Sequence, residues 1–214
     1  MSINSTKIPV LASRLDLLEV SSSIGTLPRV GAVACPCLDV AEAKALVSVV
    51  DQLEYRPAKA ITGSDNAPVY QDFDLCYDIP SGHSLWEFAQ VLEQALTSAL
   101  AGAEVDSECY PLRLNDLIVQ RYPPGCAGIT PHRDHVRYGF LIAIILLTGD
   151  GYFGICDDRQ GNESREIDFK PGDLLLMGGP GLIPNFRRPF HFVNGVTDWR
   201  RTIGLRYDTH KSDA

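Results

Sequence analysis

Long hydrophobic runs are missing from this sequence, and their absence excludes a helix that spans a membrane. The longest apolar run, from Phe140 to Leu147, is much shorter than the roughly 20 residues that such a helix needs. The start of the chain lacks a basic stretch followed by an apolar one, so no secretory signal is expected and the predicted location is cytoplasmic. Internal repeats and low-complexity segments are absent too, and 214 residues fit one domain with a substantial core.

Cysteine spacing of the kind that binds zinc is also missing. Cys35 and Cys37 are separated by one residue, whereas a CxxC motif has two between its cysteines. The other four cysteines are Cys76, Cys109, Cys126 and Cys156. Because disulfides are rare in proteins that are not exported, most of the six are predicted to be buried free thiols.

Positive charge is scarce in the first half of the chain. Residues 1–110 contain 6 Lys and Arg against 15 Asp and Glu, a net charge of −9, whereas residues 111–214 have a net charge of +1. Proteins that bind nucleic acids need a basic surface, because contacts to phosphates supply most of their non-specific affinity. The charge distribution therefore argues against a nucleic-acid partner.

Two amphipathic helices are predicted in this first half. Asp39 and Glu42 form the pattern of a capping box, and apolar residues recur at helical spacing from there to about Tyr55. Ser84 and Glu87 form a second such pattern, which opens a helix to about residue 100.

Strands dominate the rest of the prediction. Residues 1 to about 30 are expected to form an irregular arm, and residues 56 to 80 a loop with short strands. The predicted strands lie at about 115–122, 138–147, 152–157, 173–177, 189–194 and 199–207. The polar segment from Asp157 to Asn162 is the expected tip of a hairpin. Two helices that buttress a run of antiparallel strands predict an α+β, mainly β fold: a double-stranded β-helix of the jelly-roll class.

The residue types of a non-haem iron site stand in this strand-rich half. His132 and Asp134 are two positions apart, and His191 follows 59 residues after His132. At the end of a strand, a His-x-Asp pair points both side chains to one face, and a strand that folds back can bring the second histidine alongside. Two histidines and one carboxylate bind Fe(II) on one face and leave the other open for a chelating co-substrate and O2.

Two arginines point to the identity of that co-substrate. Arg200 and Arg206 share one face of a predicted strand, and Arg201 faces the other way unless a β-bulge exchanges the faces. A guanidinium binds a carboxylate through two parallel hydrogen bonds, so the pair suits a dicarboxylate such as 2-oxoglutarate, with Arg201 as the alternative partner. Asp116 and Asp208 are interpreted as surface residues at strand ends.

In this order and spacing, the motifs resemble those of the AlkB-like Fe(II)/2-oxoglutarate dioxygenases. The resemblance extends from about Leu114 to Tyr207. It includes the lead-in Gln120–Gly125, the metal pair within Pro131–Asp134, the turn and strand Phe169–Leu176, His191, and the arginine pair.

The resemblance implies a role for each motif. His132, Asp134 and His191 would bind iron, and Arg200 would pair with the far carboxylate of 2-oxoglutarate. Arg206 would lie near the 1-carboxylate. Tyr122 would hydrogen-bond the co-substrate, with Gln120 in a neighbouring role, although the family more usually has Asn there. The activity implied is oxidation of a C–H bond with release of succinate and CO2.

One departure concerns the substrate. Family members that repair alkylated bases have an acidic residue one or two places after the metal aspartate, whereas this chain has His135 and Val136. A small molecule, hydroxylated, demethylated or desaturated, is therefore the leading substrate class. Demethylation of a nucleobase, oxidation of a protein side chain, and a non-catalytic binding module remain the alternatives.

Candidate substrate contacts follow from position alone. Arginines and one histidine near the metal motifs could bind an anionic group or form a solvated rim, and an aromatic residue of the 56–80 segment could be a contact or a core residue. These candidates are Arg133, His135, Arg137, Arg187, Arg188 and Tyr70. Residues 1–113 are expected to supply arm, helices and lid, and residues 114–208 the catalytic core, of a single domain over residues 1–214. Neither the oligomeric state nor the substrate follows from the sequence.

Overall fold

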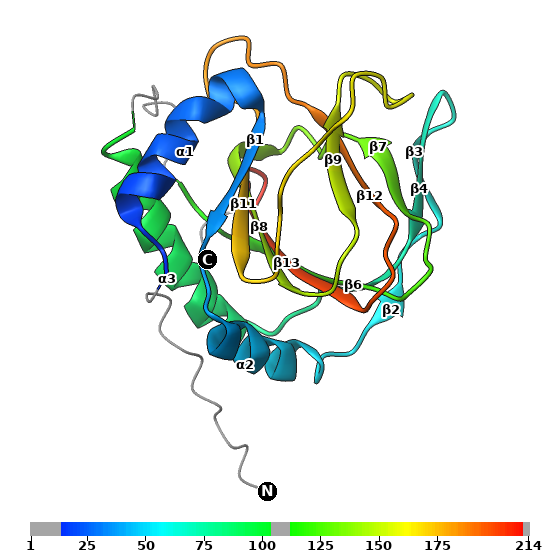
Figure 1. Ribbon diagram of the computed structural model, residues 1–214, viewed down its shortest axis with the longest axis horizontal. Helices are drawn as coiled ribbons and strands as arrows, with labels where there is room; N and C mark the ends of the chain where they lie inside the picture. Colours follow the sequence, from blue (N-terminus) through cyan, green and yellow to red (C-terminus); the bar gives the residue numbers. More distant parts are fainter. Residues whose placement is uncertain (1–13, 104–111, 212–214) are drawn as a thin grey trace, which may run out of the picture.

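The computed structural model describes residues 14–103 and 112–211, and strands dominate that part of the chain (Figure 1). Its helices are α1 (Leu17–Val30), α2 (Val40–Val50) and α3 (Ser84–Leu100). Its strands are β1 (Ala32–Pro36), β2 (Arg56–Pro57), β3 (Ile61–Ser64), β4 (Ala67–Asp72), β5 (Asp74–Cys76), β6 (Asp116–Tyr122), β7 (Gly128–His132), β8 (Tyr138–Thr148), β9 (Tyr152–Cys156), β10 (Arg165–Glu166), β11 (Asp173–Gly178), β12 (Phe190–Asn194) and β13 (Arg200–Asp208). The mainly β prediction is confirmed.

Two antiparallel sheets face each other. The larger has the strand order β1-β11-β8-β13-β6-β5-β2, and the smaller has the order β10-β9-β12-β7-β4-β3. Neighbouring strands often lie far apart in the sequence, as in a jelly roll. Figure 1 shows the three helices together against the larger sheet, on the side away from the smaller one. The structure therefore confirms a double-stranded β-helix buttressed by helices.

The packing of β8 explains why its sequence is a continuous apolar run rather than an alternation of apolar and polar residues. Leu141, Ala143 and Ile145 are buried in the core that the helices share with the larger sheet. Ile142 and Leu146 belong to the second core, which lies between the two sheets. Because successive side chains point to opposite faces of a strand, both faces of β8 are covered, and a strand buried on both faces reads as a continuous apolar run.

The two predicted helices are present, with one change at a cap. Asp39 and Glu42 form the expected reciprocal capping box at the start of α2. α3 begins as predicted, but its N-cap is His83 rather than Ser84: Nδ1 of His83 accepts a hydrogen bond from the backbone N–H of Leu85. The sequence pattern found the helix and misplaced the capping side chain by one residue.

The prediction of an irregular arm up to residue 30 was wrong over α1. Asp16 caps this helix by accepting hydrogen bonds from the backbone N–H groups of Leu18 and Glu19. Val20, Ile24 and Leu27 are fully buried and lie at helical spacing. The serines and Pro28 of this segment are poor helix formers, but burial of an apolar face contributes more to helix stability in a protein than intrinsic propensity does.

The remaining expectations for this half concern cysteines and membranes. Cys35, Cys37, Cys76 and Cys156 are buried free thiols, as predicted, and Cys126 is free and partly exposed. Cys109 and the first thirteen residues of the predicted arm lie outside the described residues. In the described ranges, none of the helices combines the length and the apolar character needed to cross a membrane.

Candidate metal centre and co-substrate cavity

The three predicted metal ligands meet in space. His132, Asp134 and His191 each offer a ligand atom, and these atoms all lie within 4.8 Å of one another. The two imidazole rings have their centroids 4.1 Å apart. His191 is buried, and the other two are partly exposed. This arrangement suits a single metal ion that is reached from one side.

Pairing of β7 with β12 brings the histidines together. His132 and His191 are directly opposite each other in the antiparallel ladder. The register shifts between His191 and Val193, which pair with His132 and Ile129, and Gly128, just before Ile129, has φ +79°. A Cβ atom at Gly128 would collide with the carbonyl oxygen of Val193, so the close approach of these strands requires glycine.

Asp134 is positioned differently from the expectation. β7 ends at His132, so the carboxylate lies in the loop that follows and not on the strand. Arg188 fixes this loop, since its Nη1 donates a hydrogen bond to the carbonyl oxygen of Asp134 at 2.8 Å. The carboxylate thus joins the histidines through a tethered loop rather than through strand alternation.

The protonation states of the three groups suit a metal. Burial lowers the pKa of His191 to about 3, with the charge of His132 adding to the shift. Burial also lowers the pKa of His132. Burial alone would raise the pKa of Asp134, but His191, Arg206 and His132 outweigh it and the pKa is lowered. At neutral pH the site therefore presents two neutral imidazoles and one carboxylate, the forms that bind metals.

The ligand set opens into a cavity between the two sheets. The cavity has about 470 Å³ of free space, including its open mouth. It is lined by His132, Asp134 and His191 and also by Gln120, Tyr122 and Arg200, all of them predicted from the sequence. The lining residues that the sequence analysis missed are Ile129, Ile144, Phe153, Val193 and Thr202. Thr202 could have been found, because it shares the strand face of Arg200 two residues away.

Arg200 is the cation of this cavity. It is 1% exposed, and no carboxylate of the described residues forms an ion pair with it. Its Nη1 donates a hydrogen bond to the carbonyl oxygen of Asp150 at 2.9 Å, and its Nε is buried without a partner. Burying an unpaired charge is costly, so the fold sustains a cationic group in a cavity where Asp134 is the one carboxylate among the lining residues.

The ladder between β6 and β13 places the neighbours of this arginine. Tyr122 is directly opposite Arg200, and Gln120 is directly opposite Thr202. The hydroxyl of Thr202 donates a hydrogen bond to Oε1 of Gln120 at 3.3 Å, which orients the amide. Burial raises the pKa of Tyr122, so the phenol keeps its proton at neutral pH and can donate it in a hydrogen bond.

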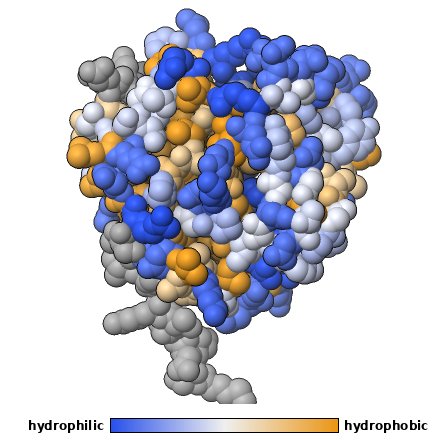
Figure 2. Space-filling model, in the orientation of Figure 1, coloured by the Kyte–Doolittle hydropathy of each residue, from blue (hydrophilic) through white to orange (hydrophobic). Residues whose placement is uncertain are grey.

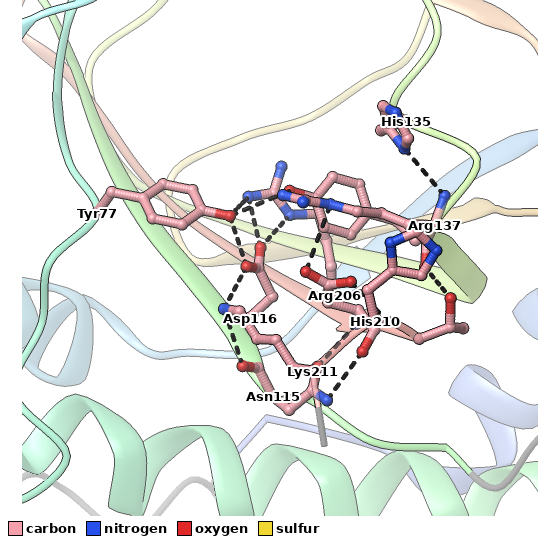
Figure 3. A network of polar contacts seen from close by, with 11 residues as sticks. Tyr77, Asn115, Asp116, His135, Arg137, Arg206, His210 and Lys211 are labelled. Atoms are coloured by element: carbon pink, nitrogen blue, oxygen red, sulfur yellow. Dashed lines mark hydrogen bonds and ion pairs between the residues drawn. The ribbon is translucent and has the colours of Figure 1, made fainter. Parts of the chain in front are cut away.

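Arg206 is held by a carboxylate outside the cavity lining. Nε and Nη2 of Arg206 lie 2.9 and 2.7 Å from Oδ2 of Asp116. Nζ of Lys211 lies 2.6 Å from the other oxygen, and the hydroxyl of Tyr77 donates to the same carboxylate. Figure 3 shows these side chains converging on Asp116. Arg206 does not line the cavity, but its charge acts on Asp134.

The interpretation of Asp116 and Asp208 as surface residues was wrong. Asp116 is 0% exposed and Asp208 is 1% exposed. Burial by itself would raise the pKa of Asp116, but Arg206, Lys211 and Tyr77 outweigh it and the pKa is lowered. The carboxylate is therefore an anion in the interior, and it fixes the guanidinium of Arg206.

Arg201 is not placed as an alternative partner for the co-substrate. Its guanidinium pairs with Asp51 at the end of α2, with Nε 2.6 Å from Oδ1. The register of β13 against β8 does shift between Arg201 and Thr202. Even so, Arg200 lines the cavity and Arg201 does not.

The candidate substrate contacts surround the metal loop without lining the cavity. The guanidinium of Arg133 lies over the ring of Phe190, and Arg188 contacts the carbonyl of Asp134. Arg187 and His135 are exposed.

Arg137 is engaged elsewhere, since it pairs with Asp208 at 3.4 Å and donates a hydrogen bond to the hydroxyl of Tyr138. Tyr70 is 54% exposed on β4. Its backbone N–H donates to the hydroxyl of Thr130, two residues before His132 on β7.

Comparison with known proteins supports the fold. No protein-family model and no curated protein matches the sequence. An oxidoreductase of the 2OG-Fe(II) oxygenase family from Burkholderia pseudomallei is 16% identical, with a TM-score of 0.59 over 92% of this chain and 91% of that one. A prolyl-4-hydroxylase from Pseudomonas putida is 14% identical, with a TM-score of 0.62 over 88% of this chain and 98% of that one.

A further solved structure belongs to the same group. It is a prolyl hydroxylase from Trichoplax adhaerens in complex with a hypoxia inducible factor peptide fragment, 12% identical, with a TM-score of 0.62 over 90% of each chain. At such identities the likeness concerns the fold. The chain has the double-stranded β-helix fold of the 2OG-Fe(II) oxygenases, with a His-Asp-His cluster in its cavity.

Proposed function

We propose that this chain is an Fe(II)/2-oxoglutarate-dependent oxygenase acting on a small molecule. One observation carries the proposal: the buried and unpaired guanidinium of Arg200 shares a cavity with the His132, Asp134 and His191 cluster. A group of three possible metal ligands alone occurs in many kinds of protein, and a buried arginine alone occurs in many protein cores. Together in one cavity they provide for a metal and for a carboxylate that reaches it.

The residues fit an iron ion. Two neutral imidazoles and a carboxylate are the donor set of non-haem Fe(II) sites. Nδ1 of His132 lies 3.0 Å from the carbonyl oxygen of Thr130, a contact of the kind that orients a metal-binding imidazole and leaves its other nitrogen for the ion. Nδ1 of His191 is a buried atom without a partner, and buried polar atoms of this sort are usually satisfied by water or an ion.

The residues also fit 2-oxoglutarate. Arg200 would pair with its far carboxylate, and the protonated phenol of Tyr122 would donate to the same group, with Gln120 alongside. Arg206 would sit near the 1-carboxylate end, supported by its action on Asp134 at the metal end of the site. When bound, the iron and 2-oxoglutarate would react with O2 and oxidise a C–H bond of the substrate, with release of succinate and CO2. Ile144, Phe153 and the other apolar wall residues would keep water from the reacting groups.

The substrate class rests on what the chain lacks. Neither His135 nor Val136 is a carboxylate that could receive a flipped base, and both are exposed. The first half of the chain is acidic, which disfavours a polyanion. The sequence motifs resemble those of the AlkB-like branch. The proposal is that residues 1–214 form one catalytic domain and that its reaction is the oxidation of a small molecule.

Succinate release tests the proposal. Protein loaded with Fe(II) under anaerobic conditions and then given 2-oxoglutarate and O2 should release succinate slowly, and the Fe(II)–2-oxoglutarate complex should absorb visible light. His191→Ala should abolish both signals, whereas His210→Ala, which changes an exposed histidine, should leave them intact. A His191→Ala protein that is as active as the wild type would disprove the ligand assignment. Strong stimulation by a methylated single-stranded oligonucleotide would replace the small molecule with a nucleobase.

A further inference from the structure

Four arginines that the cavity does not use gather around the metal loop. Arg133 stands between two metal ligands, Arg187 and Arg188 come just before β12, and Arg159 follows β9. β12 pairs with both β7 and β9, and its first residues lie opposite the last residues of those strands. The segments that carry these arginines therefore meet at one end of the three strands. We call this set the arginine rim.

Phe190 and backbone carbonyls hold the rim in place. The guanidinium carbons of Arg133 and Arg159 lie 4.1 and 5.5 Å from the centroid of the Phe190 ring. Arg188 donates to the carbonyl of Asp134, and Arg187 donates to the carbonyl of Asp157. None of the four forms an ion pair with a carboxylate of residues 14–103 or 112–211. These contacts fix positions without neutralising any charge.

The charges of the rim act on one another. The guanidinium groups of Arg133 and Arg159 lie over the same Phe190 ring, so these two positive charges are close together. Nε of Arg133 is buried without a hydrogen-bond partner. The chain as a whole has a net charge of −8, so carboxylates were available in number. Like charges kept close and unpaired destabilise the free protein, and an anion that bridges them would relieve the repulsion.

Space for an anion lies beside the rim. A cleft with about 580 Å³ of free space, open to solvent, has Arg187 and Arg188 in its wall together with Arg29 and Arg165. In Figure 2 the upper right of the molecule, where Figure 1 shows the loops between β9 and β10, is mostly hydrophilic. Planar guanidinium groups match the oxygens of phosphate, sulfate and carboxylate groups with paired hydrogen bonds.

We propose that the arginine rim binds a single anionic group of the substrate while the substrate's reacting carbon lies at the metal cluster. The substrate is then a small molecule with a phosphate or chemically similar oxyanion. This inference rests on the proposed function for the role of the bound molecule, but not for the binding itself. The rim is short, and the cleft wall includes Asp157 and Glu163, so it lacks the extended basic footprint that a nucleic acid needs.

Calorimetric titration of the metal-free protein with inorganic phosphate tests the inference. The double variant Arg159→Gln/Arg187→Gln changes two exposed side chains that touch no metal ligand, and it should weaken phosphate binding at least tenfold. Arg56 is an exposed arginine on β2, far in the sequence from the arginine rim. Arg56→Gln should therefore leave phosphate binding unchanged. Equal affinity in the wild type and the double variant, or no binding to either, would overturn the inference.

Two further titrations test whether the anion binds in the co-substrate cavity and whether the arginine rim binds nucleic acid. Arg200→Lys should leave phosphate binding unchanged, and a loss in that variant alone would place the anion in the co-substrate cavity and overturn the inference. A short single-stranded oligonucleotide should bind no more tightly than phosphate. Tighter binding that depends on Arg159 and Arg187 would make the rim a nucleic-acid site instead. Because these titrations contain neither iron nor 2-oxoglutarate, failure of succinate release would leave their result standing.

Discussion

Replacing Asp116 with asparagine should destabilise the protein strongly, because the change removes a buried charge without changing the shape of the side chain. Asp116 is 0% exposed and its partner Arg206 is 12% exposed, so the variant leaves a cation in the interior without its anion. Breaking a buried ion pair in this way costs about 3–5 kcal/mol. Asparagine can still accept one hydrogen bond, so we expect the lower end, about 3 kcal/mol. For a chain of this size, that lowers the Tm by about 6–12 °C.

The chain offers a matched control for this change. Asp168 and Lys170 also lie 2.7 Å apart, but their side chains are 78% and 69% exposed. Exposed pairs contribute about 0–1 kcal/mol, so Asp168→Asn should lower the Tm by no more than about 4 °C. Urea denaturation followed by circular dichroism measures both variants, and calorimetry gives the Tm values.

Two results would refute the reasoning. Equal destabilisation by Asp116→Asn and Asp168→Asn would mean that burial does not decide the contribution of the pair. The double variant Asp116→Asn/Arg206→Met removes both buried charges and should be more stable than Asp116→Asn alone, since the remaining cation, Lys211, has a side chain that is 42% exposed and can be hydrated. A double variant that is less stable would show that the two residues contribute separately.

Three other changes test the site and its scaffold. Arg200→Lys should weaken 2-oxoglutarate binding at least tenfold, about 1.4 kcal/mol, because lysine cannot form the paired hydrogen bonds; calorimetry should show iron affinity unchanged. Gly128→Ala should destabilise the protein and weaken metal binding, because its Cβ meets the carbonyl of Val193. Gly125→Ala is the control: the residue has the same φ of +79°, but its Cβ would meet nothing within 4 Å, so its effect should be smaller. Equal effects of the two variants in denaturation and metal titration would contradict this reasoning. As the pH falls below about 3.9, the ordinary pKa of aspartate, the wild type should progressively lose the stability that the lowered pKa of Asp116 provides, and the difference from Asp116→Asn measured by urea denaturation should shrink.

The strands and the site were predictable for different reasons. Strands such as β8 and β13 follow from local composition, and the structure places them within one or two residues of the predicted ranges. The members of the site followed from residue types in a particular order along the chain. Six of the seven predicted metal and co-substrate residues line one cavity, whereas the seventh, Arg206, pairs with Asp116 outside the cavity lining.

What failed depended on contacts between distant segments. α1 contains serines and a proline, and its stability comes from the face that it buries against α3, β1 and β11. The sequence predicted that Asp134 lies on a strand with His132. In the structure it lies in a loop, which is held by Arg188, 54 residues further along the chain. No local pattern reports contacts of that kind.

Asp116 shows most clearly why burial of a charged residue is hard to read from a sequence. Taken alone, an aspartate at the start of a strand is more often exposed than buried. Its partners are Tyr77, Arg206 and Lys211, which come from the segment after β5, from the last strand and from the residues beyond it. Only the completed sheet brings them together, and the resulting carboxylate holds the guanidinium whose charge acts on Asp134. The polar network at this end of the barrel and the metal cluster are therefore electrostatically connected. Asp116→Asn should accordingly weaken metal binding as well as lower stability, whereas Asp168→Asn should leave metal affinity unchanged.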